Sequence, residues 1–396
     1  MTQHILVINA GSSSIKYQLI DVATGVRQTS GLVERIGEGL GRVKHESDGR
    51  EFEWQTEIAD HTEAFAQMAR GFADAGTPLD TLDLAAVGHR VVQGGSEFLT
   101  ATLIDDHVAE RILALSDLAP LHNPANYSAI VAARAAFADV PHVAVFDTSF
   151  HQTLPEAAYS YAIAPEVAAQ YGVRRYGFHG ISHQVVSQRA AELLGRPLTE
   201  LKQIVLHLGN GASACAVDGG RSVDTSMGLT PLEGLVMGTR SGDIDPGALL
   251  HLMRAGLSVE ALDRLLNKQS GLLGLGGSND MRDIRAGVAA GDPAARLAFD
   301  IYVRRLKHYI GAYLALLGGV DTIVFTAGVG ENHAPMREAV CSGLEWLGIE
   351  IDPVRNESPD RGARVVSSDA SRVAILVVPT DEEAEIARQA AEVTAR

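Results

Sequence analysis

Two segments of the chain, residues 5–16 and 204–213, share one pattern of apolar and small polar positions. Each starts with an apolar run, turns through glycine with serine or asparagine, and continues with alternating character. This pattern predicts a buried strand, a tight turn and a return strand. Small residues let backbone N–H groups approach a phosphate closely and point at it. One such turn fits an ordinary hairpin, whereas two predict a duplicated fold that holds a nucleotide phosphate chain.

Strand and helix patterns alternate through both halves of the chain. Asp292-Pro293 predicts a helix start, with an aspartate cap and proline at the first helical position, and Gly318-Gly319 predicts its end. The other predicted elements are strands at 84–92, 142–146, 321–325 and 373–378, a helix at 62–75 and a closing C-terminal helix. Alternation of this kind predicts two α/β domains that face a cleft, with a boundary near residue 150.

Glycine is concentrated in three further segments. Residues 327–332 follow an apolar strand and predict a third turn of the phosphate-binding kind, because ligands of α/β sheets bind beyond the carboxyl ends of strands. The segments 37–41 and 271–277 predict mobile loops. The chain has no P-loop and no G-x-G-x-x-G after a strand, so a bound nucleotide would be held by another scheme.

The composition disfavours several classes of partner. Of 396 residues, 46% are hydrophobic, 5% are aromatic and the formal net charge is −16, which disfavours nucleic acid and an anionic membrane surface as partners. Cys215 and Cys341 lack metal-ligand spacing, which fits a reducing cytosol. The chain shows no leader pattern and no membrane span, so we expect a cytoplasmic protein.

Three cationic or titratable side chains lie among glycines and other small residues. These are Arg90 in Gly-His-Arg, His179 in Tyr-Gly-Phe-His-Gly and Arg240 in Gly-Thr-Arg-Ser-Gly. An arginine in such a setting suits reaching into a site, where its planar fork matches carboxylate or phosphate oxygens. A surface ion pair is the ordinary alternative for each arginine. A structural hydrogen bond is the alternative for lone histidines such as His122, His183 and His207.

Three carboxylates are predicted just after strands, at Asp147, Asp245 and Glu382. Hard oxygen ligands in that position suit Mg²⁺, which takes few protein ligands and keeps waters and phosphates. Helix capping is the alternative, and Asp381-Glu382 stands where an N-terminal cap would. The pattern leaves both open.

Longer motifs resemble the acetate kinase (acetokinase) family. They occur in the family's order from residue 5 to residue 383. The motifs are Asn-Ala-Gly-Ser-Ser-Ser-Ile-Lys at 9–16, Gly-His-Arg-Val-Val at 88–92, Phe-Asp-Thr-Ser-Phe-His at 146–151, Tyr-Gly-Phe-His-Gly at 176–180, His-Leu-Gly-Asn-Gly at 207–211, Met-Gly-Thr-Arg-Ser-Gly-Asp at 237–243, Asp-Met-Arg-Asp at 280–283 and Gly-Val-Gly-Glu-Asn at 328–332. The chain differs from the common family pattern at Gln93, at Asp381 and at 276–279.

The resemblance implies duplicated actin-like (ribonuclease H-like) α/β domains with ATP in an interdomain cleft. The expected domains are 1–150, joined by the C-terminal helix 384–396, and 151–383, which carries most of the nucleotide site. The resemblance also implies a homodimer and a role in acetyl-CoA biosynthesis through acetyl phosphate.

The resemblance assigns roles to individual residues. Arg90, Asp147, His179 and Arg240 would surround the reacting groups, and Asn9 and Glu382 would hold Mg²⁺, with Mn²⁺ as an alternative. The nucleotide would be bound by Ser12, Lys16, His207, Leu208, Gly209, Asn210, Gly211, Asp280, Met281, Arg282, Gly328, Val329, Gly330, Glu331 and Asn332. Acetate would contact Arg90, Val92, Leu121, His122, Phe178 and Pro231.

The implied reaction is reversible, Mg²⁺-dependent, in-line phosphoryl transfer from ATP to acetate, giving acetyl phosphate and ADP. A carboxylate is already ionised at neutral pH, so no general base is needed and the barrier is electrostatic. A propionate or butyrate kinase of the same family is the near alternative, because one methylene changes binding only modestly. A non-enzymatic actin-like ATP switch is the alternative from another class.

Overall fold

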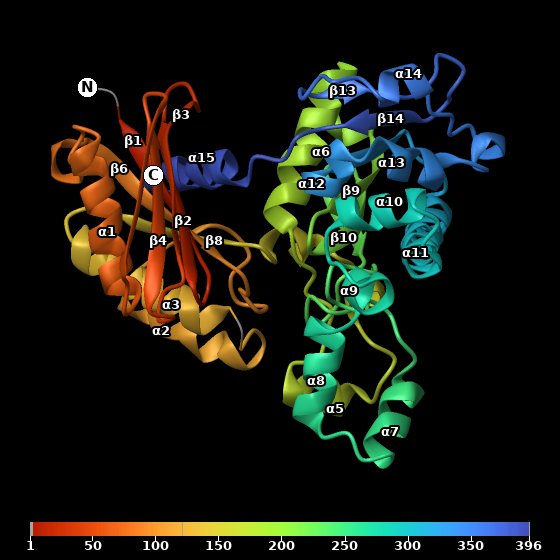
Figure 1. The fold of residues 1–396 in the computed structure, drawn as a ribbon, viewed down its shortest axis with the longest axis horizontal. Helices are drawn as coiled ribbons and strands as arrows, with labels where there is room; N and C mark the ends of the chain where they lie inside the picture. Colours follow the sequence, from red (N-terminus) through yellow and green to blue (C-terminus); the bar gives the residue numbers. More distant parts are fainter. Residues whose placement is uncertain (1–2, 121, 396) are drawn as a thin grey trace. The chain divides into compact units, whose positions relative to one another are not determined.

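The computed structural model describes residues 3–120 and 122–395, which form two compact units. Unit 1 contains Met1–Ser149 and Asp381–Arg396, and unit 2 contains Phe150–Thr380. Each unit is built on one β-sheet covered by helices (Figure 1). The C-terminal segment therefore belongs to the same unit as the N-terminal strand.

The sheet of unit 1 has the order β5-β4-β3-β2-β1-β6-β8-β7. Its strands are β1 (His4–Ala10), β2 (Ser14–Asp21), β3 (Arg27–Glu34), β4 (Leu40–Ser47), β5 (Arg50–Glu57), β6 (Leu84–Val91), β7 (Thr102–Leu103) and β8 (His142–Phe146). The strands β1, β6 and β8 run parallel, whereas β2 to β5 form an antiparallel meander that continues from β1. The carboxyl ends of β1, β6 and β8 therefore meet at one edge of the sheet.

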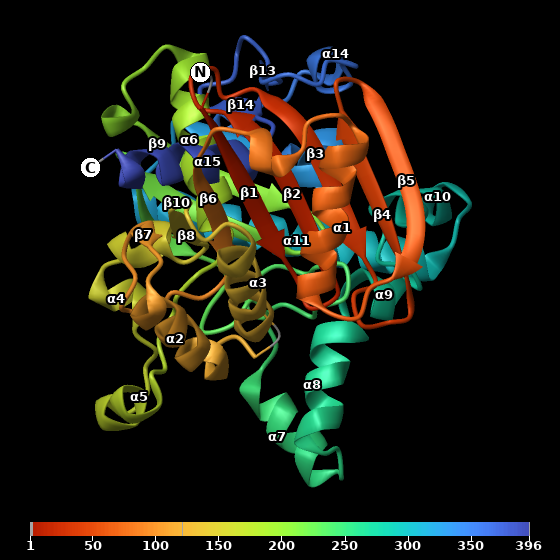
Figure 2. The same cartoon turned by 90° about the vertical axis from the view of Figure 1, so that its left-hand side faces the viewer.

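Helices cover both faces of this sheet. They are α1 (His61–Asp74), α2 (Asp106–Ala114), α3 (Asn123–Ala136) and α15 (Glu382–Thr394). Alternate residues of β1, such as Leu6 and Ile8, pack in one core with α1 and α3, which lie on the near face in Figure 2. The helix α15 lies on the opposite face (Figure 1). A Cβ at Gly88 of β6 would lie 2.9 Å from Ile386 of α15, so glycine permits this close packing.

The sheet of unit 2 has the order β11-β10-β9-β12-β14-β13. Its strands are β9 (Lys202–Leu208), β10 (Ala212–Asp218), β11 (Arg221–Thr225), β12 (Thr322–Thr326), β13 (Arg364–Val365) and β14 (Ala374–Val377). The run β11-β10-β9-β12-β14 repeats the pairing of β3-β2-β1-β6-β8, with two antiparallel pairs followed by two parallel pairs. The predicted duplicated α/β fold is therefore confirmed.

Most helices belong to unit 2. They are α4 (Glu156–Tyr159), α5 (Pro165–Tyr171), α6 (Gly180–Leu194), α7 (Pro246–Arg254), α8 (Val259–Lys268), α9 (Gly271–Gly276), α10 (Met281–Ala289), α11 (Pro293–Leu317), α12 (Ala327–Asn332), α13 (Ala334–Cys341) and α14 (Pro353–Asn356). Short 3₁₀ turns complete the described chain at Leu79–Thr81, Leu115–Asp117, Ser149–Thr153, Leu198–Glu200 and Glu345–Leu347.

The local signals around α11 are confirmed. Asp292 caps the helix by accepting a hydrogen bond from the Ala294 N–H at 2.9 Å, and Gly318 ends it in the left-handed conformation with φ 65°. No described helix combines the length and the apolar character needed to cross a bilayer.

The interpretation of two glycine-rich segments as loops is only partly right. Gly37 and Gly39 lie in the turn between β3 and β4, and Gly277 follows the end of α9, but the remaining glycines lie in regular elements. Residues 271–276 form α9, because the Leu272 and Leu273 N–H groups bond to the carbonyls of Met237 and Gly238 at 2.9 Å each. Gly41 lies inside β4, where a Cβ would come within 2.6 Å of the Ile58 side chain. Residues 327–332 form the short helix α12 rather than an open turn. Tertiary contacts determine the secondary structure of these segments, and glycine content alone does not predict those contacts.

Candidate active site

The first glycine-rich turn joins β1 to β2 in unit 1. The Gly11 N–H donates to the Ser14 carbonyl at 2.8 Å, and the antiparallel register places Asn9 opposite Lys16. The Lys16 Nζ lies 2.5 Å from Glu383 Oε1 at the start of α15. The strand that follows the turn, β2, therefore contacts the first turn of α15, although Lys16 and Glu383 are 367 positions apart.

Arg90 and two carboxylates form a largely shielded ionic cluster at the carboxyl edge of the unit 1 sheet. Arg90 lies on β6, and Asp147 directly follows the parallel neighbour β8. The Arg90 Nη2 donates to Asp147 Oδ2, and Arg90 Nε lies 3.5 Å from Glu382 Oε2. Exposed side-chain fractions of 19% for Arg90, 1% for Asp147 and 17% for Glu382 make this cluster a candidate for charge chemistry.

Burial and charge act in opposite directions on this cluster. Burial lowers the Arg90 pKa, but attraction by Asp147 and Glu382 outweighs it, so that the pKa is raised from its ordinary value. Burial raises the pKa of Glu382, against the opposing attraction of Arg90. Each ionised group is therefore stable here mainly through its partners.

The three acidic residues that begin α15 have different roles. The Asp381 Oδ1 accepts from the Ala384 N–H at 3.1 Å and caps the helix, as its position predicts. Glu382 and Glu383 follow in the first turn, where the helix dipole favours negative charge. Glu382 faces Arg90, whereas Glu383 binds Lys16.

The third predicted carboxylate does not follow a strand, so that prediction is wrong. Asp245 begins α7 and accepts from the Gly247 N–H at 2.9 Å, well after β11 ends at Thr225. It is an exposed helix cap, which is the alternative that the sequence left open for it.

Amides from α3 fix the strand ends of unit 1. The Asn126 side chain accepts from the Val92 N–H at 3.1 Å and donates to the Ala10 carbonyl at 2.8 Å. The Asn123 side chain bonds both the N–H and the carbonyl of Gln93. The sequence analysis missed both asparagines, because nothing in their local pattern separates them from surface residues.

Two residues of the expected acetate pocket also lie near α3. His122 occupies the position directly before that helix, and Val92 is buried at the end of β6. Leu121 lies outside the described residues.

His179 of unit 2 is held in an unusual conformation. It precedes α6 with φ 55°, in the left-handed region that a residue other than glycine seldom adopts. Its Nδ1 lies 2.9 Å from Ser213 Oγ, and its ring stacks on His207 with centroids 4.2 Å apart. His207 is itself bonded through Nδ1 to Ser182 Oγ at 2.8 Å. Backbone strain of this kind persists only where several surrounding contacts hold the residue in place.

The second glycine-rich turn lies against Arg240 and His179. A Cβ built on Gly211 would be 3.3 Å from Arg240 Nη2 and 3.3 Å from His179 Nε2. The Arg240 Nη1 donates to the Pro231 carbonyl at 2.7 Å, and burial lowers the Arg240 pKa. The structure therefore brings Arg240, His179, Gly211 and Pro231 together.

A pocket of about 890 Å³ in unit 2 contains many of the expected nucleotide residues. It is lined by Gly209, Asn210, Leu272, Asn279, Asp280, Met281, Arg282, Arg285, Ala286, Ala289, Tyr302, Gly328, Val329, Asn332 and His333. Asp280 caps α10 and pairs with Arg282 at 2.5 Å; its hydrogen bond with Arg282 lowers its pKa to about 2. The volume falls in the range typical of small-molecule sites.

Five of the expected nucleotide residues in unit 2 do not line this pocket. Leu208 is fully buried in β9, and the Glu331 carboxylate accepts from the Ala327 N–H at 2.9 Å within unit 2. His207, Gly211 and Gly330 are also absent from the lining.

A sequence model of the acetokinase family matches residues 4–388. The chain belongs to this family. It is 61% identical to the acetate kinase of Leifsonia xyli over 99% of both chains, and 58% identical to that of Streptomyces coelicolor over 97% of this chain and 95% of the other.

Solved structures of the acetokinase family superpose over nearly the whole chain. An acetate kinase from Porphyromonas gingivalis matches with a TM-score of 0.93 and 42% identity, covering 99% of each chain. A propionate kinase from Francisella tularensis matches with a TM-score of 0.93 and 40% identity, covering 99% of this chain and 100% of that one. The resemblance and the fold class predicted from the sequence are confirmed.

The acetokinase motifs did not reveal every residue of the unit 2 pocket. Arg285 and Ala289 lie on the same face of α10, a spacing that could have suggested them once Met281 and Arg282 were assigned. Tyr302 and His333 gave no such signal. Tyr302 belongs to the regular apolar face of α11, and His333 begins α13 by accepting from the Met336 N–H.

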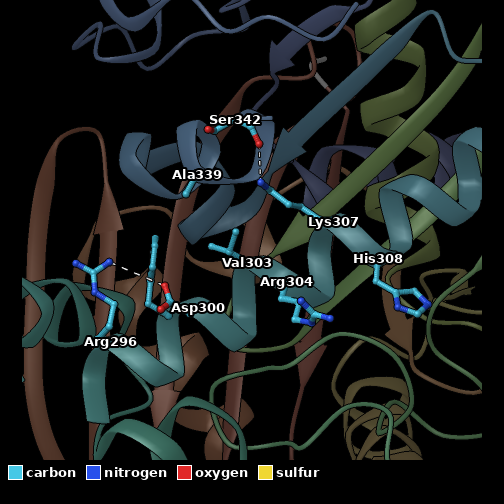
Figure 3. Close-up of a pocket in the computed structure, with 9 residues that line it drawn as sticks. Arg296, Asp300, Val303, Arg304, Lys307, His308, Ala339 and Ser342 are labelled. Atoms are coloured by element: carbon cyan, nitrogen blue, oxygen red, sulfur yellow. Dashed lines mark hydrogen bonds and ion pairs between the residues drawn. The ribbon is translucent and has the colours of Figure 1, made fainter. Parts of the chain in front are cut away.

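A separate pocket of about 700 Å³ lies along α11 and contains none of the predicted acetokinase site residues (Figure 3). Its basic side chains include Arg296, which pairs with Asp300 at 3.9 Å, and Lys307, which donates to the Ser342 carbonyl at 2.5 Å. We assign this pocket no part in the reaction.

Proposed function

We propose that this member of the acetokinase family transfers the γ-phosphoryl group of ATP to acetate, giving acetyl phosphate and ADP. One observation supports this most directly. Within unit 2, the turn that lines a nucleotide-sized pocket through Gly209 and Asn210 also lies beside Arg240 and His179 at Gly211. A nucleotide in that pocket could place its terminal phosphate beside both groups.

We propose direct in-line transfer without a general base. The acetate nucleophile is ionised at neutral pH, so the barrier comes from repulsion between anions and from charge on the moving oxygens. Donors fixed before the reaction lower such a barrier most, because they need no reorganisation. Arg240 and His179 would act on the phosphoryl group, and Arg90 on acetate and the phosphoryl group.

Asp147 acts through Arg90 in this proposal. Its carboxylate is almost fully buried and accepts a hydrogen bond from the guanidinium, which fixes the direction in which Arg90 presents its remaining N–H groups. We therefore treat Asp147 as a positioning residue and do not assign it a proton-transfer step.

Mg²⁺, with Mn²⁺ as an alternative, is proposed to be held in unit 1 by Asn9 and Glu382. The partly buried Glu382 carboxylate and the Asn9 amide are hard oxygen donors, and Asn9 lies near the carboxyl end of β1. Among residues 3–120 and 122–395, the structure contains no group of three or more His, Cys, Asp or Glu side chains that could hold a metal. The proposed site therefore consists of the two donors Asn9 and Glu382. This donor set fits Mg²⁺, which binds through few protein ligands and neutralises phosphate charge.

Acetate selectivity is proposed to come from Val92, Leu121, His122, Phe178 and Pro231. Val92 and Phe178 are buried apolar side chains, suited to a methyl group. Because one of the solved relatives is a propionate kinase, propionate is the second candidate substrate. One methylene changes binding by only ~1–3 kcal/mol, so we expect some activity with propionate.

Hydroxylamine trapping of acyl phosphate, with acetate, propionate and butyrate in parallel, tests the proposal. We expect the highest kcat/KM with acetate. A higher value with propionate or butyrate would reassign the substrate. ATP hydrolysis without any acyl phosphate would refute the carboxylate kinase and favour a nucleotide switch.

The family resemblance further supports a cytoplasmic homodimer as a proposal. Light scattering coupled to size-exclusion chromatography would test the dimer, and a single protomer mass at micromolar concentration would contradict it.

A further inference from the structure

One buried serine of unit 2 lies between two histidine rings. Ser213, on β10, places its Oγ 2.9 Å from His179 Nδ1 and 2.7 Å from His183 Nε2. The Ser213 and His183 side chains are both fully buried. The three residues thus form a continuous chain of hydrogen bonds that ends at the strained His179.

The number of protons available for these hydrogen bonds is limited. A hydroxyl carries one proton, so Ser213 can donate to one ring nitrogen and must accept from the other. Burial lowers the pKa of His183 well below its ordinary value, and the neighbouring His151 and His207 lower it further. His183 is therefore neutral and carries a single N–H.

The surroundings of His183 decide which nitrogen carries that proton. Its Nδ1 is buried and has no hydrogen-bond partner in the described part of the chain. A buried N–H without an acceptor is rarer and more costly than an unused acceptor, so the proton belongs on Nε2. His183 then donates to Ser213, and Ser213 donates to His179 Nδ1.

We propose that His183 and Ser213 hold His179 in the tautomer protonated at Nε2, so that His179 donates a hydrogen bond to the transferring phosphoryl group. Nε2 is the ring nitrogen on the side of Gly211, where a built Cβ would be 3.3 Å from it and 3.3 Å from Arg240 Nη2. Two donors then converge on the phosphate-binding turn. The phosphoryl acceptor rests on the proposed function, whereas the tautomer does not.

A second set of contacts restricts rotation of the same ring. His179 stacks on His207, which is tied through Ser182 Oγ to Thr380 Oγ1 at 2.9 Å. A ring fixed on its face by His207 and at Nδ1 by Ser213 presents Nε2 in one direction. Ser213 and His183 are thus positioning residues that act through His179.

The tautomer can be measured directly in the full-length protein. Long-range ¹H–¹⁵N spectra of protein labelled with ¹⁵N-histidine distinguish the two neutral tautomers, and a His179→Gln variant assigns the His179 signals. We expect the Nε2–H pattern for His179 in the wild type and its loss in Ser213→Ala. The hydrogen-bonded series His183–Ser213–His179 is called the relay below. A wild-type His179 protonated at Nδ1 would refute this relay, whatever the enzyme's substrate.

Kinetics test what the relay contributes to turnover. We expect Ser213→Ala to lower kcat by about 10-fold or more, with the KM values for ATP and acetate changing less than about 3-fold, because a donor used at the transition state is lost. Ser213→Thr keeps the hydroxyl and should restore most of kcat.

Ser222→Ala is the matched control. Ser222 Oγ lies 2.8 Å from Nδ1 of His151, another fully buried histidine in the same unit that is not part of the relay. We expect this variant to retain kcat within about 3-fold. Equal losses in Ser213→Ala and Ser222→Ala would show a general structural effect and refute the relay. If Ser213→Ala does not fold, the wild-type spectrum still decides the tautomer.

Discussion

The two glycine-rich turns occupy the same place in the five-strand run that the two sheets share, but the cations of the two units are neutralised differently. In unit 1, Arg90 meets Asp147 and Glu382, and Lys16 meets Glu383. In unit 2, Arg240 bonds a backbone carbonyl and forms no ion pair with any residue that the structure describes.

This difference predicts that the two cations respond differently to a bound anion. A buried cation paired with carboxylates is stable in the absence of ligand, whereas a buried cation without a carboxylate is stabilised by a bound anion. Burial lowers the pKa of Arg240, while partners raise that of Arg90. The two units thus share a strand arrangement, whereas Arg90 is paired with carboxylates and Arg240 bonds a backbone carbonyl.

Removing the unpaired cation should have the largest effect on catalysis. We expect Arg240→Ala to lower kcat by at least ~10²-fold, because a donor preorganised for the phosphoryl group is lost. Its unfolding free energy without ligand should stay within about 1 kcal/mol of the wild type, since no ion pair breaks. Steady-state kinetics and urea denaturation check both, and wild-type activity would refute the assignment.

The paired cation should affect both activity and stability. We expect Arg90→Ala to lower kcat by at least ~10²-fold and also to destabilise the protein by about 3 kcal/mol, because Asp147 and Glu382 remain buried without their partner. The same two measurements apply. Equal unfolding free energies of Arg90→Ala and Arg240→Ala would contradict the proposed difference between the two units.

Removing the charge of Asp147 should have a smaller effect. We expect Asp147→Asn to lower kcat by about 10-fold, because the amide still contacts Arg90 but orients it less firmly. Activity is measured at saturating Mg²⁺ so that a change in metal affinity does not contribute. Full turnover under these conditions would exclude an essential role for Asp147.

Buried histidines should make the protein sensitive to acid. Burial lowers the pKa of His151 to about 4, so the native state stays neutral while the unfolded state gains a proton below about pH 6.5. Stability from this group is therefore complete above pH 6.5 and falls as the pH drops toward 4.

His151→Gln tests this acid sensitivity. Between pH 6.5 and 4.5, the wild type should lose roughly 2 kcal/mol more unfolding free energy than the variant. Urea denaturation at the two pH values measures the difference, and parallel losses would contradict it. The variant's own lower stability cancels from this comparison.

The strands around the site were predictable because their signals are local. A mainly apolar run followed by a turn indicates β8 and β9, and a capped helix start indicates α11. The proximity of Arg90 and Asp147, which are 57 positions apart, was expected only through the family resemblance. It arises from parallel pairing of β6 and β8, which no local pattern encodes.

Residues that act through tertiary contacts escaped prediction for the same reason. Asn126 bonds two strand ends from a helix, and Ser213 bridges two rings from separate positions around α6. Segment 271–276 was misinterpreted because its helix depends on carbonyls of Met237 and Gly238. A high glycine content shows only that a segment is free to adopt many backbone conformations. Hydrogen bonds to residues distant in the sequence decide which conformation it adopts.

The sequence by itself determined the alternation of elements, the duplicated turns and the acetokinase family, because apolar periodicity, caps and long motifs are properties of neighbouring residues. Only the tertiary structure decided which charges are paired. The same type of side chain, an arginine among glycines, became an ionic partner at Arg90 and a partly buried donor without an ion pair at Arg240. The reason is that burial and the distance to a carboxylate, which set the free energy of a charge, exist only once the strands have assembled.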